Sequence, residues 1–400
     1  MAKVETFVSN PELLVKPGEK LIEVKDLSVG FVSHGKKIHV IRNVSLDIYK
    51  GETLAIVGES GSGKTVFTKT FMGMLDSNAF ISSGSITYHD RIRKVDQEKS
   101  DLESKRLNEK VTVETIEEHD VDLVPLKKQE EWLWLRGKKI ATIFQDPMTS
   151  LNPLFTIGYQ ITEVLRLHHG LGKKEAKEEA IRLLEKVKIP DAARRFKDYP
   201  YQYSGGMRQR VVIAIALACR PDVLICDEPT TALDVTVQNQ ILELIKELQK
   251  EYAWTTIFIT HDLGVVAKVA NRIAVMYGGE VVEYGTAEDI FYRPEHPYTW
   301  ALLASLPQLG TKEEPLAYIK GNPPSFANEI TGDPFASRND YALRIDYIVN
   351  PPMFKVSETH YAKTWLLDKR APKVEKPKVI RELKSRMRAA AEELQREDIK

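Results

Sequence analysis

Residues 58–65 read Gly-Glu-Ser-Gly-Ser-Gly-Lys-Thr, and this order of a glycine, four residues and then Gly-Lys-Thr is typical of a phosphate-binding loop. A continuous apolar run at 54–57 precedes the loop, as expected of a buried parallel strand. A helix that carries Phe67, Phe71 and Leu75 is expected to follow. Glycines let backbone N–H groups converge on phosphate oxygens, and a helix N-terminus adds its dipole. The stretch therefore predicts a strand, a phosphate loop and a helix within an α/β fold.

The loop supplies most of the predicted nucleotide-binding side chains. Lys64 is expected to bring positive charge to the β and γ phosphates, and the Thr65 hydroxyl is expected to ligate Mg²⁺. The other predicted phosphate-binding residues of the loop are Gly58, Ser60, Gly61, Ser62 and Gly63.

A second apolar run, at 223–226, ends in the acidic pair Asp227 and Glu228. Open α/β sheets bind their ligands at the C-terminal ends of the strands. We expect Asp227 to hold Mg²⁺ and Glu228 to polarise the water that attacks the terminal phosphate. Taken alone, the pair could be a solvated strand end, but its combination with the phosphate loop favours the site.

The rest of the chain predicts an α/β fold with a mainly parallel sheet, because apolar runs alternate with amphipathic helices. An antiparallel region is expected at 21–48, and a charged segment at about 90–126 is interpreted as a surface insertion. Further strands are expected at 140–144, 223–226, 256–259 and 273–276, and helices at 159–189, 211–218 and 237–248.

Composition limits the possible functions. Lys and Arg together number 57, as do Asp and Glu, so the chain lacks the basic excess of a dedicated nucleic-acid binder. Cys219 and Cys226 have apolar neighbours, which predicts buried free thiols in a reducing compartment. The N-terminus shows no signal-peptide pattern, and the longest apolar run, 211–219, is too short to span a bilayer. A membrane role is therefore expected to go through a partner.

Residues 203–210 read Tyr-Ser-Gly-Gly-Met-Arg-Gln-Arg, and here the chain resembles the ATP-binding cassette (ABC) ATPases over about 21–307. The resemblance implies a phosphate-loop cassette with a parallel core, an antiparallel β subdomain and a helical subdomain at about 146–215. It implies that ATP and Mg²⁺ bind, with Gln145 near the metal and γ-phosphate and His261 orienting the attacking water.

The resemblance also implies sets of site residues. The implied catalytic set is Lys64, Gln145, Glu228 and His261. Phe31 is expected to stack on adenine, with a role in the core as the alternative. Residues that face the nucleotide of the opposite subunit are implied at Ser204, Gly205, Gly206 and Asp234.

Longer stretches resemble the oligopeptide and dipeptide importers among these ATPases. They lie at 144–153, 203–210, 294–299 and 321–324. The resemblance implies a peripheral subunit on the cytoplasmic side of a bacterial cell membrane. Its implied partners are a second ABC ATPase in a heterodimer, two transmembrane permeases and an extracellular peptide-binding lipoprotein, and no nucleic acid. Importers of dipeptides, nickel or oligosaccharides share these motifs and remain alternatives.

The expected organisation is an N-terminal segment at 1–20, the ATPase at 21–307, a C-terminal extension at 308–373 and a charged helical tail at 374–400. Many relatives carry four cysteines in that extension. This chain has other residues there: Asp333, Asn339, Asp346 and Thr364. We therefore expect no iron–sulfur cluster and an extension that is held by apolar packing alone.

Two other classes compete with an importer subunit. A soluble ABC ATPase acting on nucleic acid or ribosomes would favour two cassettes, or a long coiled coil, and a basic surface, whereas this chain has one cassette and no net charge. A regulatory subunit that binds nucleotide without hydrolysing it would lack catalytic residues, and all of them are present.

Overall fold

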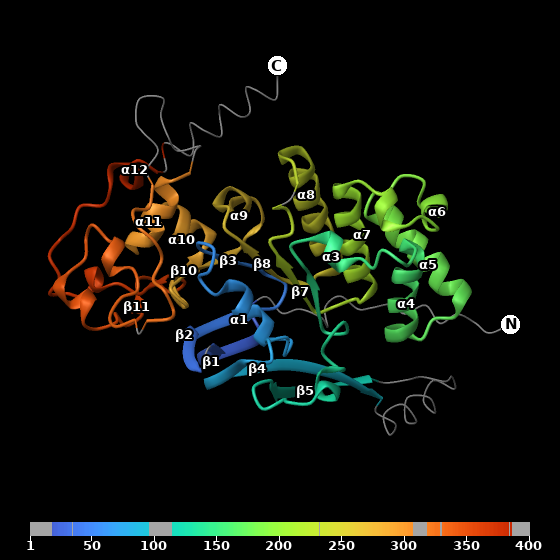
Figure 1. The fold of residues 1–400 in the computed structure, drawn as a ribbon, viewed down its shortest axis with the longest axis horizontal. Coiled ribbons are helices and arrows are strands. Elements are labelled where there is room, and N and C mark those ends of the chain that lie inside the picture. Colours follow the sequence, from blue (N-terminus) through green and yellow to red (C-terminus); the bar gives the residue numbers. More distant parts are fainter. Residues whose placement is uncertain are drawn as a thin grey trace, which may run out of the picture.

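The computed structural model describes residues 18–33, 35–95, 114–231, 233–306, 318–328, 330–383 and 385. Most of the expected N-terminal segment, the middle of the charged segment and the end of the C-terminal tail lie outside the described residues. One β-sheet lies in the middle of the view and a second lies below it, with helices grouped beside and above the first (Figure 1).

The larger sheet has the strand order β11-β12-β10-β9-β3-β8-β7-β6. Its central strand β3 (Thr53–Val57) is buried along its whole length and pairs in parallel with β8 (Thr255–Thr260) and β9 (Arg272–Tyr277). β7 (Val223–Asp227) continues the parallel pairing from β8 to β6 (Ile140–Ile143). The expected parallel core is thus confirmed, and burial on both faces explains its continuous apolar runs.

Three antiparallel strands extend this sheet beyond β9. β10 (Glu280–Thr286) pairs with β9, and the two-residue strands β12 (Tyr361–Ala362) and β11 (Phe354–Lys355) follow it. The last two come from the C-terminal region, so this region is built onto the edge of the catalytic sheet. Strands of two residues have no periodicity that the sequence could reveal.

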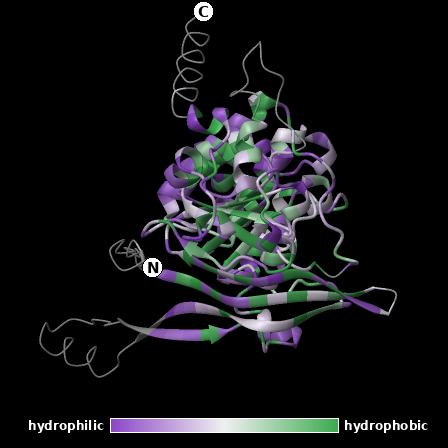
Figure 2. Ribbon diagram, turned by 90° about the vertical axis from the view of Figure 1, so that its left-hand side faces the viewer, coloured by the Kyte–Doolittle hydropathy of each residue, from purple (hydrophilic) through white to green (hydrophobic). Residues whose placement is uncertain are grey.

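The smaller sheet is antiparallel, with the order β2-β1-β4-β5. Its strands are β1 (Lys20–Ser33), β2 (Lys36–Tyr49), β4 (Ala79–Val95) and β5 (Glu114–Asp122). Part of the segment expected to be a surface insertion forms β5 and the end of β4, which pair from Thr87 opposite Asp122 to Val95 opposite Glu114. An edge strand tolerates charge on both faces, which hides its strand character in the sequence. Hydrophilic and hydrophobic residues alternate along this sheet in Figure 2.

The helices cover the two faces of the larger sheet and form a separate group near β6. α1 (Lys64–Thr70) lies between the sheets, where Phe67 packs with Leu54 and Ile56. On the opposite face lie α8 (Val235–Tyr252), α9 (Leu263–Val269), α10 (Ala287–Tyr292) and α11 (Pro297–Ala304). The expected helical subdomain comprises α3 (Pro147–Ser150), α4 (Ile157–His169), α5 (Lys173–Lys186), α6 (Ala192–Arg195) and α7 (Gly205–Ala218). A short helix, α12 (Lys378–Arg381), packs near α11.

Two expectations from composition can be compared with this fold. Cys219 and Cys226 are buried and free, as expected, and burial raises the pKa of the Cys219 thiol to about 11. None of the helices in the described part of the chain combines the length and apolar character that crossing a membrane requires.

A polar contact joins the two sheets. Tyr88 on β4 is fully buried, and its hydroxyl donates to Asp222 Oδ2, at the start of β7, over 3.0 Å. Lys139 Nζ lies 2.7 Å from Asp90 and 3.2 Å from Asp222, so the same carboxylate also receives a cation. Burial and the Asp222 charge raise the pKa of Tyr88, so this hydroxyl stays protonated and remains a donor.

Replacing Tyr88 by Phe should lower the free energy of unfolding by about 1–2 kcal/mol, because the ring is kept while Asp222 loses a buried donor. Urea denaturation followed by tryptophan fluorescence would measure the change. Tyr318→Phe is the matched control, since Tyr318 is 78% exposed, and should stay within about 0.5 kcal/mol of the parent. Equal effects of the two variants would contradict a contribution from the inter-sheet hydrogen bond.

Candidate nucleotide site

The phosphate loop connects β3 to α1 and requires glycine where the backbone passes close to its neighbours. A Cβ atom on Gly58 would lie 2.1 Å from the carbonyl oxygen of Met276 on β9. Gly63 precedes α1 with φ 101°, and a Cβ there would lie 2.7 Å from Ile41 Cδ1. The spacing of the loop glycines therefore reflects both the packing of β9 and β2 against the loop and the left-handed turn before α1.

Lys64 is folded back into its own loop. Its Nζ donates to the carbonyl oxygens of Gly58 at 2.8 Å and Glu59 at 3.0 Å, and the residue is only 6% exposed. Burial lowers the pKa of Lys64, while the charges of Glu228 and Asp227 act in the opposite direction. The Ser62 hydroxyl is also buried and, among the described residues, has no hydrogen-bond partner. A cation and an unsatisfied hydroxyl in one narrow loop fit the oxygens of a phosphate group.

Two predicted metal ligands are in direct contact. The Thr65 hydroxyl on α1 donates to Asp227 Oδ1 at the end of β7 over 3.1 Å. Burial raises the pKa of Asp227, and the hydrogen bond from Thr65 opposes that shift. A hydroxyl and a carboxylate are the oxygen ligands that Mg²⁺ accepts, so this pair fits the ion. Gln145, the third predicted ligand, lies two residues beyond the end of β6, and its Nε2 contacts Glu228 instead.

Glu228 is the point where separate segments of the chain meet. Its Oε2 accepts from Gln145 Nε2 at 3.3 Å and from the Thr231 hydroxyl at 3.0 Å, and its Oε1 lies 3.1 Å from His261 Nδ1. Glu228 also has φ 47°, a left-handed conformation that is unusual outside glycine and is often found at functional sites. The sequence analysis did not predict the contact of Thr231 with Glu228, although Thr231 lies only three residues farther along the chain.

The residues expected to face an opposite subunit form their own group. Ser204 caps α7 by accepting from Met207 N–H at 3.4 Å, and Asp234 caps α8 by accepting from Val237 N–H at 2.9 Å. A Cβ on Gly206 would lie 2.5 Å from Val237 Cγ1, so the two helix starts touch. Among the hydrogen bonds of the described residues, none joins this group to the phosphate loop. The group also includes Gly205, and its place in the nucleotide site of an opposite subunit stays a prediction.

Phe31 lies on β1, opposite Ile38 of β2 and Ala79 of β4. It is half-buried and does not belong to the buried core, which speaks against the alternative of a purely internal role. Stacking on adenine stays a prediction.

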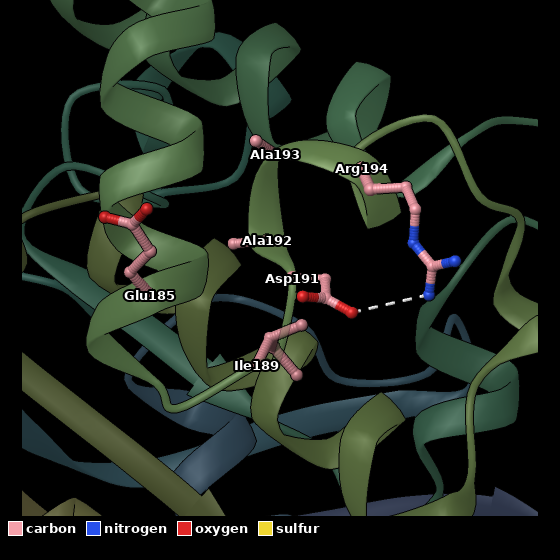
Figure 3. Close-up of a pocket in the computed structure, with 6 residues that line it drawn as sticks. All are labelled: Glu185, Ile189, Asp191, Ala192, Ala193 and Arg194. Carbon is pink, nitrogen blue, oxygen red and sulfur yellow. Dashed lines mark hydrogen bonds and ion pairs between the residues drawn. The ribbon is translucent and has the colours of Figure 1, made fainter.

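A separate pocket of about 520 Å³ lies in the helical subdomain between α5 and α6 (Figure 3). Its side chains include the exposed pair Asp191 and Arg194, 3.5 Å apart, and Glu185 on the facing helix. None of the predicted nucleotide-site residues lines it.

The C-terminal region corrects one expectation. The residues at the cysteine positions are buried, and each side-chain oxygen accepts a backbone N–H: Asp333 from Phe335 (2.8 Å), Asn339 from Tyr341 (2.9 Å), Asp346 from Leu343 (2.6 Å) and Thr364 from Leu366 (3.3 Å). The expectation of apolar packing alone is therefore wrong. Buried oxygens need donors, and here they organise the turns of the region. Within the described residues no three His, Cys, Asp or Glu side chains converge as a metal site.

Comparison with solved structures defines the class of this fold. The ATP-binding cassette MJ0796, in a dimeric post-hydrolysis state bound to ADP and phosphate, superimposes with a TM-score of 0.52 at 26% identity, covering 67% of this chain and 99% of that one. The cbiO1 subunit of a Clostridium perfringens ABC transporter complex gives 0.53 at 24% identity, covering 69% and 92%. The protein is an ABC-type ATPase.

Sequence comparisons narrow the class. The ABC transporter family matches residues 41–231, and the oligopeptide/dipeptide transporter C-terminal region matches 282–345. The oligopeptide transport ATP-binding protein AmiE of Streptococcus pneumoniae is 56% identical over 94% of this chain and 97% of its own length. The protein OppD of Bacillus subtilis is 50% identical over 93% and 95%. The chain belongs to the family of oligopeptide/dipeptide transport ATP-binding proteins.

Asp333 should make stability depend on pH. Burial, reinforced by the charges of Asp346 and Glu280, raises the pKa of Asp333 to about 7, while the Phe335 N–H and Lys363 oppose the shift. The folded state then binds more protons than the unfolded state between about pH 4 and 7, so stability falls as pH rises through this window. Asp333→Asn keeps an acceptor for Phe335 N–H without the charge. At pH 8 the substitution should raise the melting temperature, and the free energy of unfolding should rise by at most about 4 kcal/mol. Below pH 4 the melting temperature should be unchanged.

Thermal unfolding at pH 4 and pH 8 measures this difference. Asp340→Asn is the matched control, because Asp340 is exposed and pairs with the exposed Lys320 on the surface. An Asp333→Asn variant that is equally destabilised at both pH values would contradict a buried, partly protonated carboxyl.

Proposed function

We propose that the residues around Glu228 hydrolyse ATP and that this hydrolysis drives the uptake of oligopeptides into a bacterial cell. The observation that carries the assignment is the convergence of Gln145, Thr231 and His261 on one carboxylate at the end of a parallel strand. Gln145 and His261 come from segments far from Glu228 in the chain, and a solvated strand end would not collect donors from both. The importer family to which the chain belongs supplies the class of solute.

In the proposed mechanism the phosphates lie along the loop of 58–65. Lys64 would exchange its two carbonyl partners for phosphate oxygens, and backbone N–H groups would complete the cradle. Thr65, Asp227 and Gln145 would hold Mg²⁺, which offsets phosphate charge when bound. Glu228 would accept a hydrogen bond from the attacking water, and His261 would orient that water. Positioning and electrostatic stabilisation of this kind provide most of the rate enhancement in phosphoryl transfer.

Transport would require a second ABC ATPase subunit. Ser204, Gly205, Gly206 and Asp234 would complete the nucleotide site of that subunit in a head-to-tail pair. ATP would then bind the closed pair more tightly than the open pair, and so shift the population toward the closed pair. Hydrolysis would remove the contacts that favour closure.

A groove beside Gln145 is suited to the transmembrane partner. It has a volume of about 440 Å³ and lies between β6, the end of α1 and α7. Its mostly apolar lining includes Met72, Met74, Phe144, Val212 and Ile215. We propose that a permease segment binds here, so that motion of Gln145 reaches the membrane.

Two permeases and an extracellular peptide-binding lipoprotein would complete the importer, with this subunit on the cytoplasmic side. The alternatives are a dipeptide, nickel or oligosaccharide importer built on the same subunit.

Replacing Glu228 by Gln should leave ATP binding intact and lower turnover by at least about 100-fold, because the amide keeps the size of the side chain but cannot serve as a base. Equilibrium binding of a fluorescent ATP analogue and phosphate release together separate the two effects. Lys64→Ala is the companion variant and should lose binding itself. Hydrolysis near the parent rate in Glu228→Gln would remove Glu228 from its proposed role.

A pull-down from detergent-solubilised membranes tests the transport assignment. Tagged protein should recover a second ABC ATPase, two permeases and a peptide-binding protein, identified by mass spectrometry. Met74→Asp should lower permease recovery several-fold because it places a charge in an apolar groove, while Leu167→Asp, at a 74% exposed position outside the groove, should not. Recovery of ribosomal or DNA-bound proteins without permeases would contradict the importer and favour a soluble ABC ATPase.

A further inference from the structure

The C-terminal region reaches back to the phosphate loop through Arg338. The Arg338 Nη1 atom lies 2.8 Å from Glu59 Oε2 and 2.9 Å from the Tyr277 hydroxyl, and its side chain is only 5% exposed. Its Nε donates to the carbonyl oxygen of Lys320 over 2.7 Å. Glu59 is the second residue of the loop, so a region distant in sequence holds one of the loop's own side chains.

A second contact holds the backbone of the same residue. The Tyr298 hydroxyl, fully buried at the start of α11, accepts from Glu59 N–H at 2.8 Å. Phe335, from the C-terminal region, packs edge-on against Tyr277 and Tyr298, with ring centroids 5.1 and 5.3 Å away. One cluster thus holds both the side chain and the backbone of Glu59. It comprises Tyr277, Tyr298, Phe335 and Arg338.

Glu59 brings a negative charge into a loop whose ligand is a polyanion. Its carbonyl oxygen already accepts from Lys64 Nζ at 3.0 Å, so its carboxylate is close enough to influence that ammonium. An unpaired carboxylate here would attract Lys64 and repel phosphates. The Arg338 guanidinium neutralises it and draws it to the side of the loop that faces the C-terminal region.

We propose that Arg338 is a positioning residue for ATP binding: by pairing with Glu59 it keeps the phosphate loop open to nucleotide, and it makes nucleotide affinity depend on the C-terminal region. This inference rests on the proposed assignment of residues 58–65 as the nucleotide site. It gives the C-terminal region a role in the reaction besides that of a structural appendage.

The test titrates the purified full-length chain with a fluorescent ATP analogue. Arg338→Met, which keeps the length but not the charge, should raise the Kd about tenfold. Adding Glu59→Gln to that variant removes the carboxylate that has lost its partner, and should lower the Kd again by at least about threefold. Arg338→Lys should lie in between, since it keeps a cation without the forked donors. Arg370→Met is the matched control, because Arg370 is exposed and pairs with Asp368 on the surface, away from the loop. This variant should bind as the parent does.

The pattern of rescue separates positioning from folding. A merely structural arginine would give two losses that add, whereas the proposal requires the second substitution to restore affinity. An unchanged Kd in Arg338→Met, or no recovery on adding Glu59→Gln, would overturn it. If Arg338→Met does not fold, judged by its circular dichroism spectrum, the same comparison is made with Arg338→Lys, and no gain on adding Glu59→Gln overturns the proposal equally. Lys64→Ala distinguishes the two proposals. If Lys64→Ala still binds nucleotide, the assignment of residues 58–65 as the nucleotide site is wrong. If Lys64→Ala loses binding while Arg338→Met keeps the parent Kd, only the role of Arg338 is wrong.

Discussion

The parallel register of β3, β8 and β7 is the constraint on which the site depends. Val57 lies opposite Thr260, and Asp227 lies opposite Ile259, so the three strands end at the same level. The Glu228 N–H then donates to the carbonyl oxygen of Ile259 at 2.9 Å. The hydrogen bonding between β7 and β8 thus continues one residue beyond Asp227. Glu228 and His261 meet because each directly follows one of these strand ends, and the loop that carries Lys64 follows the third. A shift of one residue in either pairing would turn these side chains to the other face of the sheet.

The charges at this edge are arranged around an anion that the chain does not itself supply. Among the described residues, the hydrogen-bond partners of Lys64 Nζ are carbonyl oxygens. The Thr65–Asp227 pair presents oxygen ligands, and Glu228 is held by uncharged donors and a histidine. Because Lys64 and Asp227 are both largely withdrawn from water, electrostatic interactions with phosphate and metal are stronger here than at the surface. In the proposed site the Thr65–Asp227 pair and the contacts of Glu228 are thus already formed, whereas Lys64 would exchange its carbonyl partners for phosphate oxygens.

The C-terminal region is organised by buried oxygen acceptors. Asp333, Asn339, Asp346 and Thr364 each accept a backbone N–H in a turn. Further polar contacts attach the region to the catalytic sheet, among them the pair of Lys363 with the buried Glu280 and that of His360 with Glu283. The region is therefore an integral part of the sheet edge, and Arg338 extends it to the phosphate loop.

The sequence by itself determined the α/β class, the parallel core and the position of the phosphate loop, because buried strands, glycine-dependent turns and acidic strand ends leave local patterns. It also placed Gln145, Asp227, Glu228 and His261 at strand ends, which parallel pairing brings to one edge. Only the tertiary structure decided that Gln145 and His261 both contact Glu228, that charged residues form β5, and that Arg338 and Tyr298 hold Glu59. These contacts join residues that are far apart in the chain or carry no periodic pattern. Their geometry follows from how the sheets, helices and C-terminal region pack, which no local stretch of sequence encodes.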